Sequence, residues 1–496
     1  MARVLAIDLG SSSGRAVRGE YQDGSLTYQE IYRFENVPVQ KGRYLCWDFD
    51  LLLGEVKHAI EMAGDIDSIG IDTWGADFGI LDKKGKLLMP PVHYRDRRTE
   101  GMTGKAQEKF SAKELFQMCG NQTYATNSLY QILALKETEP ELWNQTAKIL
   151  HMPDLINYFL CGNAVCERTI ACTTQMLEPV SRSWNQRVLE AYQIPETLFA
   201  PLTDSGTVIG EYTGKGTKPV KVIAVAGHDT QSAGAAMTED PDSTAFLNIG
   251  TWSLLGVERK QPILTDLGFE LGISNEQGPY RDIQCIMNIV GTWLLQECRR
   301  EWTAEGRMAS YNELERQAAL CDPFQCFIAP NSPDFAFPGH MPEKIQAFCR
   351  KTGQRAPESA GEVVRCIYES LALKYRRELE KLEQGMAEEE EKRPHAQKSA
   401  GRIEKLQILG GGAQSEMLCQ MTADICRKQV IAGPVEATAL GNLVIQLKAL
   451  GEIADEETAR ETIRRAETMT TFIPNDEIEV RKAIENAYQR FKEIDN

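Results

Sequence analysis

Short apolar runs alternate along this chain with longer stretches in which apolar positions recur every three to four residues. The short runs predict β-strands over 3–9, 67–72, 220–226, 244–249 and 405–410. The longer stretches predict helices over 50–63, 128–138, 360–383, 415–428 and 477–492. Strands that alternate with amphipathic helices are typical of an α/β fold.

The end of the first predicted strand recurs near the middle of the 496-residue chain. Asp8, Gly10, Ser11 and Ser13 correspond to four residues found 240 positions later: Asn248, Gly250, Thr251 and Ser253. The repeat predicts two domains of similar size, 1–242 and 243–496, separated near the polar, Pro-containing turn 239–242. The chain is long enough for each domain to have its own core.

Each copy of the repeat leads from a strand into a Gly/Ser/Thr turn, which exposes backbone N–H groups and hydroxyls to an oligophosphate. Asp8 at the strand end can hold Mg²⁺ through its water molecules, while the turn and Arg15 contact phosphate. A single loop of this kind would favour an ordinary hairpin turn. The second copy favours phosphate binding, and two such loops facing each other across a cleft would clamp a nucleotide.

A third glycine cluster, Gly410, Gly411 and Gly412, lies between a predicted strand and a helix for which Ser415 is a candidate N-cap. Glycines let a ligand approach the backbone closely, as an adenosine or its α-phosphate requires. A plain turn is the alternative interpretation.

Asp229 is the candidate general base. It follows the apolar strand 220–226 and precedes a stretch of small residues. A carboxylate at such a strand end can project into a cleft and accept a proton from an attacking hydroxyl. Capping of the following helix is the alternative, and the nearby second phosphate loop favours the functional interpretation.

Residues 70–79 combine an aromatic plate, Trp74, with the carboxylates of Asp72 and Asp77 and several glycines. Sugars need flat apolar faces for their C–H groups and acceptors for their hydroxyls, so this stretch is a candidate sugar loop. A Trp packed into an ordinary core is the competing interpretation.

Other patterns exclude several classes of protein. The 10–14 stretch also fits Gly-x-Ser-x-Gly, but residues 15–33 resemble strand and turn rather than the helix that a serine-hydrolase elbow needs. No P-loop pattern is present.

A net charge of −16 argues against nucleic-acid and anionic-membrane surfaces. The 13 Cys without Cys-x-x-Cys, together with the absence of a signal peptide or apolar span, predict a cytoplasmic enzyme with reduced thiols. The charged segment 384–402 is expected to be a solvated loop.

Taken together, these motifs resemble the FGGY carbohydrate kinases, and within them the bacterial branch that acts on L-rhamnulose. The stretches that carry the resemblance occur in order along nearly the whole chain: 6–10, 12–15, 69–75, 94–96, 151–154, 173–175, 228–230, 250–253 and 432–437. The resemblance implies a duplicated actin-like, ribonuclease-H-like α/β fold of two domains with a cleft between them.

The resemblance also implies an activity: transfer of the γ-phosphoryl group of ATP to the 1-hydroxyl of L-rhamnulose in L-rhamnose catabolism. Asp229 would be the general base. The sugar would contact Trp74, Gly75, Asp77, His228, Thr230 and Asn288. ATP would contact Ser11, Ser12, Ser13, Gly14, Arg15, Thr251, Gln296 and Gly411, and Asp8 would hold its Mg²⁺.

Two features of the sequence depart from the family pattern. Ala76 stands where a larger Val is expected, and the acidic insertion 386–401 is longer than usual. Two alternatives stay open: a kinase for another ketose such as L-fuculose or xylulose, and an actin-like ATPase without a sugar substrate. The expected partners are a small sugar and ATP, with neither nucleic acid nor membrane, and the chain is expected to be a monomer or a homodimer.

Overall fold

The computed structural model describes residues 1–214, 218–392 and 402–495. The chain forms two compact units. Unit 1 contains Met1–Thr238, Glu258–Cys285 and Ala437–Glu467, and unit 2 contains Glu239–Val257, Ile286–Glu436 and Thr468–Asn496. Two segments from the later half of the sequence therefore pack with the first 238 residues, so the compact units are not two continuous stretches of chain.

Unit 1 is built on a six-stranded sheet of order β13-β14-β6-β1-β2-β3. Its strands are β1 (Ala2–Leu9), β2 (Ser13–Gln22), β3 (Ser25–Glu35), β6 (Ser68–Thr73), β13 (Thr207–Tyr212) and β14 (Val220–Ala224). The helices of unit 1 are α1 (Phe49–Ala63), α2 (Met102–Gln107), α3 (Ala112–Cys119), α4 (Ser128–Thr138), α5 (Pro140–Gln145), α6 (Met152–Cys161), α7 (Arg168–Ala171), α8 (Gln186–Ala191), α9 (Asp229–Ala235), α10 (Asp266–Glu270), α16 (Ala437–Ala449) and α17 (Glu456–Ala466).

Unit 1 also contains four two-stranded sheets, three of them antiparallel and one, β9 with β12, parallel. They are β4 (Val39–Lys41) with β5 (Tyr44–Cys46), β7 (Phe78–Leu81) with β8 (Lys148–His151), β10 (Leu177–Glu178) with β11 (Ser183–Trp184), and β9 (Cys166–Glu167) with β12 (Leu202–Thr203).

The second sheet has seven strands in the order β17-β18-β16-β15-β19-β20-β21. They are β15 (Thr244–Ile249), β16 (Trp252–Arg259), β17 (Ser274–Gln277), β18 (Ile283–Val290), β19 (Lys405–Leu409), β20 (Gln429–Ala432) and β21 (Thr470–Phe472). The helices of unit 2 are α11 (Trp293–Ala304), α12 (Tyr311–Ala319), α13 (Met341–Lys351), α14 (Ala360–Glu391), α15 (Glu416–Cys426) and α18 (Ile478–Ile494).

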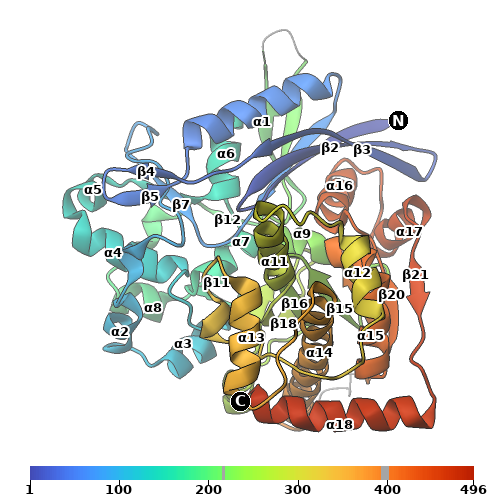
Figure 1. The fold of residues 1–496 in the computed structure, drawn as a ribbon. Helices are drawn as coiled ribbons and strands as arrows, with labels where there is room; N and C mark the ends of the chain where they lie inside the picture. The colour runs from blue at the N-terminus through green and yellow to red at the C-terminus, as the bar shows by residue number, and fades with distance from the viewer. Residues whose placement is uncertain (215–217, 393–401, 496) are drawn as a thin grey trace. The chain divides into compact units, whose positions relative to one another are not determined.

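Helices cover both faces of the first sheet (Figure 1). The odd-numbered side chains Leu5 and Ile7 of β1 belong to the same apolar core as Leu52 and Val56 of α1. The alternate positions of the neighbouring strand β6 face α16, where Ser68 bonds to Gln446. Because side chains alternate between the faces of a strand, one buried sheet separates the two helices.

The two sheets repeat one topology, which confirms the predicted duplicated α/β fold. In the first sheet β1 pairs antiparallel with β2 and parallel with β6, and β6 pairs parallel with β14. In the second sheet β15 pairs antiparallel with β16 and parallel with β19, and β19 pairs parallel with β20. The strand that contains Asp8 and the strand that contains Asn248 therefore occupy equivalent central positions.

One residue-level correspondence of the repeat needs correction. Leu9 pairs with Gly14 across the first hairpin, whereas Ile249 pairs with Ser253 across the second. The first turn therefore holds one residue more than the second, so Ser253 is the structural equivalent of Gly14 rather than of Ser13. The constant offset of 240 residues does not show this difference, because a serine follows the turn glycine three residues later in both copies.

The predicted strands and helices are present with ends that shift by a few residues, and the expected strand-and-turn character of 15–33 is confirmed by β2 and β3. The expected solvated loop over 384–402 is wrong in its first part, because α14 continues to Glu391. Gly385, Met386 and Glu389 are buried along this extension, so its few apolar groups still pack. Residues 393–401 lie outside the described residues.

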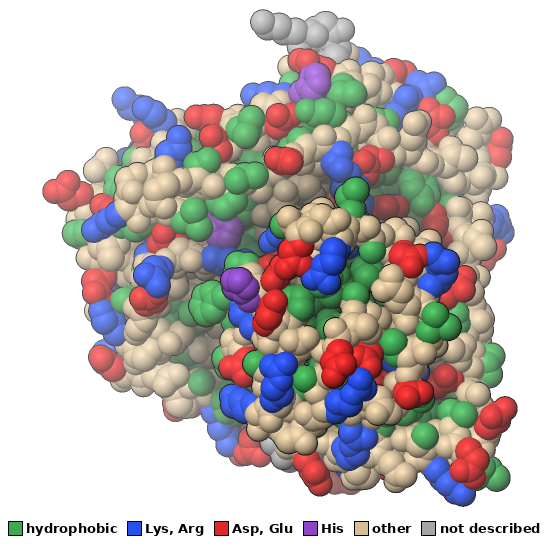
Figure 2. Space-filling view, in the orientation of Figure 1, with side chains coloured by type: hydrophobic (Ala, Val, Ile, Leu, Met, Phe, Trp, Pro, Cys, Tyr) green, Lys and Arg blue, Asp and Glu red, His purple; other side chains and the backbone are tan. Residues whose placement is uncertain are grey.

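On the face shown in Figure 2, acidic and basic side chains are interspersed over the helices of unit 2. Within the described residues, none of the helices combines the length and the apolar character that a membrane crossing requires.

Candidate active site

Three carboxylates gather where the central strands of unit 1 end. Asp8 of β1 pairs in register with Asp72 of β6, and Asp229 lies close enough to raise the pKa of Asp72. Burial is the largest cause of that rise, followed by the negative charge of Asp8. Both effects favour the neutral form of Asp72, because a second buried charge beside Asp8 would be costly.

Arg15 on β2 lies opposite Asp8 and holds its side chain in place. The Arg15 Nε and Nη2 atoms both lie 2.9 Å from Asp8 Oδ2. The turn between these two residues is stabilised by a bond from Gly10 N to Ser13 O of 2.9 Å, and Ser11 and Ser12 are exposed.

Gly14 is needed for packing as well as for the turn. A Cβ atom at this position would lie 2.2 Å from Cζ of Phe34, so a side chain would displace that ring. The glycine is buried, and its identity is explained by β3 rather than by a ligand.

A buried polar network from α16 supports the carboxylates from behind. Asn442 Nδ2 donates to Asp72 Oδ2 at 2.6 Å, and Gln446 Nε2 donates to Asn442 Oδ1 at 2.7 Å and to Leu5 O at 3.0 Å. All of these side-chain groups are fully buried. Buried networks in which the donors are satisfied are rigid, so α16 holds β1 at Leu5 and β6 at Asp72.

Asp229 begins α9, directly after the segment that pairs with the end of β6. Thr73 N donates to Gly227 O at 2.9 Å, and Thr73 forms an isolated bridge with His228. The Thr230 N–H donates to Asp229 Oδ1 at 2.6 Å, so the carboxylate partly caps its own helix. Burial raises the pKa of Asp229, and the neighbouring His228 opposes the rise.

Glu276 completes this cluster. Its Oε2 atom lies 2.9 Å from His228 Nδ1 and accepts a bond of 2.9 Å from Gln231 Nε2. Burial is the largest single influence and opposes a charged imidazole, but the nearby carboxylates, Glu276 first, together outweigh it and raise the pKa of His228 to about 9. The site therefore contains a half-buried imidazolium between two carboxylates, since His228 Nε2 also lies 3.6 Å from Asp229 Oδ1.

Four aromatic rings form a continuous stack beside the sugar loop. Trp74 packs on Trp47 with ring centroids 4.0 Å apart, Trp47 stacks on His93 at 4.2 Å, and His93 stacks on Tyr94 at 4.4 Å. Burial lowers the pKa of His93 to about 4, so this ring is neutral. Trp47, Trp74 and His93 are buried, as in an ordinary core, and only Tyr94 at the end of the stack is half-buried.

The carboxylate of Asp77 organises this stack from within. Its Oδ2 atom accepts bonds from Trp47 Nε1 at 2.7 Å, Trp74 Nε1 at 3.0 Å and Tyr94 N at 3.1 Å, and its Oδ1 atom accepts one from Gln131 Nε2 at 2.9 Å. Asp77 is fully buried, and burial raises its pKa to about 6. These donors satisfy both oxygens, so the geometry favours holding the rings over binding a sugar hydroxyl directly.

Gly75 and Ala76 bring the sugar loop close to His228. A Cβ atom at Gly75 would lie 3.4 Å from His228 Nε2 and 3.0 Å from Thr173 Cγ2. Ala76 has a φ of 71°, a conformation in which a β-branched residue such as Val is strained. Unit 1 therefore brings together Trp74, Gly75, His228, Asp229 and Thr230 from two distant parts of the sequence.

In unit 2 the second loop is joined to the start of α11. Thr292 N and Thr292 Oγ1 donate to Gly250 O at 2.9 and 2.7 Å, and Gln296 Nε2 donates to Thr292 Oγ1 at 3.0 Å. Thr251 Oγ1 lies 3.4 Å from Gln296 Oε1. Thr251 is exposed, so Thr251 and Gln296 form one polar surface beside the turn.

The third glycine cluster packs against the same strand end. A Cβ atom at Gly410 would lie 2.8 Å from Asn248 Oδ1, and one at Gly412 would lie 2.3 Å from Ile249 Cβ. Gly411 between them is exposed, and a Cβ atom added there would meet nothing within 4 Å. Asn288 on β18 is half-buried, and its carbonyl accepts a bond from Asn331 Nδ2 at 3.1 Å.

Two family models match the chain. The N-terminal domain of the FGGY family of carbohydrate kinases matches residues 3–235, and the C-terminal domain matches residues 245–450. Curated relatives include a rhamnulokinase of Bacillus subtilis, 38% identical over 480 residues, with 95% of each chain covered. A rhamnulokinase of Klebsiella pneumoniae is 38% identical over 486 residues, covering 97% of this chain and 96% of the relative.

This chain belongs to the FGGY family of carbohydrate kinases. Its fold is shared with solved structures of more distant sequence. A xylulose kinase from Lactobacillus acidophilus has a TM-score of 0.79 at 16% identity, covering 100% of this chain and 98% of that one. A Plasmodium falciparum glycerol kinase with ADP has a TM-score of 0.77 at 16% identity, covering 99% and 98%. Family membership makes the chain a sugar kinase and implies ATP as the co-substrate.

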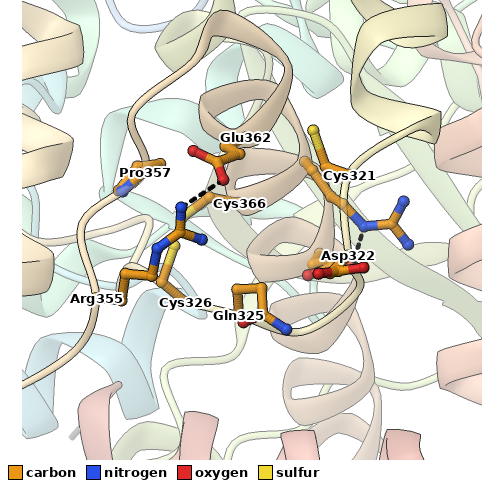
Figure 3. A pocket seen from close by; sticks show the side chains of 10 residues that line it. Cys321, Asp322, Gln325, Cys326, Arg355, Pro357, Glu362 and Cys366 are labelled. Carbon is orange, nitrogen blue, oxygen red and sulfur yellow. Dashed lines mark hydrogen bonds and ion pairs between the residues drawn. The ribbon is translucent and has the colours of Figure 1, made fainter.

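This FGGY kinase also contains a buried group of three thiols in unit 2. The Sγ atoms of Cys326, Cys349 and Cys366 lie within 4.8 Å of one another. Figure 3 shows Cys326 and Cys366 at the wall of a small pocket, where Arg355 bonds to Glu362 at 2.8 Å. Thiols suit soft metal ions and carboxylates suit hard ones, so this cluster differs in chemistry from the carboxylates of unit 1.

Sequence reasoning missed Glu276 and Asn442, and it treated Asp72 only as a part of the candidate sugar loop 70–79. The signal for Glu276 was available: four consecutive polar residues, 274–277, follow a buried Ile and form a strand in which all four are buried. A strand with polar side chains on both faces has to bury them against partners, which marks it as a place for a site.

Proposed function

We propose that this kinase transfers the γ-phosphoryl group of ATP to the 1-hydroxyl of L-rhamnulose and forms L-rhamnulose 1-phosphate. The choice of sugar rests on the curated rhamnulokinases, which match nearly the full length of the chain at 37–38% identity. A reaction of this type asks the protein for positioning, charge neutralisation and exclusion of water.

The observation that carries the proposal is the convergence of Asp229, His228 and Gly75 beside the aromatic stack. We assign Asp229 as the general base, which accepts the proton of the sugar hydroxyl as the bond from that oxygen to phosphorus forms. Because the hydroxyl proton leaves late in phosphoryl transfer, a carboxylate is a sufficient base, and burial, which raises the pKa of Asp229, makes this one a stronger base. Trp74, Gly75, His228, Thr230 and Asn288 would contact the sugar.

The nucleotide is assigned to the exposed loops. Ser11, Ser12, Ser13 and Arg15 in unit 1, and Thr251, Gln296 and Gly411 in unit 2, would contact ATP. Exposed glycines, hydroxyls and backbone N–H groups at strand ends are suited to phosphates. Gly14 would contribute by allowing the turn and the packing of Phe34.

Asp8 and the neighbouring Asp72 fit a divalent cation. The Asp8 carboxylate is held by Arg15, and Asp72 beside it keeps a buried Oδ1 atom without a hydrogen-bond partner. Oxygen ligands and local negative charge are what Mg²⁺ prefers. Asp8 would hold the ion through water molecules, and the bound ion would neutralise phosphate charge.

The test is a coupled assay of ADP release across L-rhamnulose, L-fuculose, L-xylulose, D-xylulose, D-ribulose and glycerol. We expect L-rhamnulose to give the highest kcat/KM. If another ketose gives a higher kcat/KM than L-rhamnulose, that ketose is the substrate. If ADP release is the same with and without every sugar, the ATPase alternative is favoured.

The role of Asp229 has its own variant. Asp229→Asn should keep nucleotide affinity and lose nearly all phosphorylation, while Asp50→Asn, at an exposed position in the first turn of α1, serves as control. Near-normal turnover in Asp229→Asn would remove that residue from its role.

A further inference from the structure

Glu276 is held rigidly by its neighbours on β17. Asn275 Nδ2 donates to Gly120 O at 3.0 Å and to Ile263 O at 2.9 Å, and Gln277 Nε2 donates to Pro179 O at 2.9 Å. With both adjacent side chains bonded to backbone carbonyls, the strand has little freedom to turn. The carboxylate of Glu276 is therefore directed at a fixed point, the Nδ1 atom of His228.

The hydrogen bonds define the orientation of the imidazole. Glu276 Oε2 accepts from Gln231 Nε2 and lies 2.9 Å from His228 Nδ1. An ionised carboxylate can only accept, so the proton of this bond belongs to His228 Nδ1. The other ring nitrogen, Nε2, is then directed to the side of Asp229, whose Oδ1 lies 3.6 Å away, and of Gly75.

The charges around the ring favour its protonated form. His228 is faced by Glu276 on β17, by Asp229 on α9 and by Glu167 on β9. Burial works against the charge, but these carboxylates, Glu276 first, prevail and give His228 a pKa of about 9. The pair is reciprocal, because His228 lowers the pKa of Glu276 against the effect of burial.

We propose that Glu276 is a positioning residue that fixes His228 as an imidazolium whose Nε2–H is offered to a sugar oxygen beside Asp229. The inference rests on the proposed sugar-kinase function and adds a recognition element to it. A donor that cannot accept selects a polyhydroxylated substrate with an oxygen at this point and discriminates against an analogue that lacks it. His228 keeps its proton throughout, while Asp229 takes the hydroxyl proton and ADP leaves with the electrons of the broken P–O bond.

The first measurement is the titration of His228 by NMR in protein labelled with ¹³C-histidine, without sugar or nucleotide, with the resonance assigned by His228→Gln. We expect a pKa near 9 in the wild type. In Glu276→Gln the pKa should fall below 8, roughly a tenfold change or more in the protonation equilibrium. Glu276→Asp, which keeps the charge, should retain most of the raised value.

The second measurement is the pH profile of kcat/KM for the sugar. The protonated form of His228 is the active one, so activity is present below its pKa and is lost as pH rises through about 9. Glu276→Gln should move this alkaline limb to lower pH, with the loss expressed mainly in KM for the sugar. Glu378→Gln, which removes a buried carboxylate paired with Lys374 at 2.8 Å in unit 2, should leave the limb in place.

An unchanged titration of His228 in Glu276→Gln, or an alkaline limb that moves equally in Glu378→Gln, would overturn the positioning role even in a fully active kinase. The absence of sugar-dependent ADP release in the wild type would overturn the proposed function, and the role in sugar recognition with it, whatever the titration shows. The two failures are therefore distinguishable.

Discussion

Replacing Gly441 by Ala should destabilise unit 1, although Ala is the better helix former. Gly441 lies in α16 where this helix crosses α9, and an added Cβ would lie 1.8 Å from the backbone oxygen of Ser232 and 3.1 Å from Ala235 Cβ. Real Cβ contacts are almost never under 3.0 Å, so the two helices have to separate by at least about 1.2 Å, the difference between 3.0 and 1.8 Å.

The magnitude follows from two opposing terms. Overpacking of a well-packed core costs about 1–3 kcal/mol, and the upper end applies because the clash is with backbone that cannot rotate away. The gain in helix propensity from Gly to Ala is roughly 1 kcal/mol. The net loss is about 2 kcal/mol, which corresponds to a fall in Tm of roughly 4–8 °C.

Gly54→Ala is the matched control. Gly54 is an exposed position inside α1 of the same unit, and an added Cβ there meets nothing within 4 Å. The same chemical change should therefore stabilise the protein by about 0.5–1 kcal/mol. Because α9 begins with Asp229, Gly441→Ala should also lower kcat, by about a hundredfold for a displacement near 1 Å, whereas Gly54→Ala should not.

Thermal and urea unfolding of the wild type and both variants, with the kinase assay alongside, check this reasoning. The predicted pattern is an opposite sign of the two changes in the unfolding midpoint. If Gly441→Ala unfolded at the same midpoint as Gly54→Ala, the close approach of α16 to α9 would not be needed for stability. The positioning of the carboxylates by α16 would then be unsupported.

Two further predictions concern charge and nucleotide. Burial, and then the nearby Asp282, raise the pKa of Glu258 to about 8, so the folded state retains a proton that the unfolded chain releases near pH 4.5. The free energy of unfolding should therefore fall as the pH rises from about 5 to 8. In Glu258→Gln the urea midpoint should depend less on pH over this range, and a slope equal to that of the wild type would contradict the assignment. Thr251→Val should raise the KM for ATP and leave the KM for sugar unchanged, and an unaltered ATP dependence would return the second loop to a structural turn.

Local patterns account for the part of the fold that could be predicted. The strand that contains Asp8 and the helix at 49–63 are formed by apolar positions that repeat within a few residues, and the repeat at Asn248 identifies the duplication. The extension of α14 to Glu391 was not predictable from composition, because a charged segment with few apolar residues is compatible with a solvated loop and with a helix. Packing of Met386 decides between them.

The candidate site was predictable only where its residues lie within one motif. Asp229 and His228 are adjacent in the sequence, whereas Glu276 reaches them from 48 residues away and Asn442 reaches Asp72 from 370 residues away. Along α16, Asn442 and Gln446 stand four residues apart and look like the solvated stripe of a helix, yet both are completely buried against β1 and β6. Burying an amide side chain is costly unless it finds a hydrogen-bond partner. Here the partner of Asn442 is the carboxyl group of Asp72, next to Asp8. Polar pairs on an otherwise apolar helix are therefore better evidence for a site than for a surface.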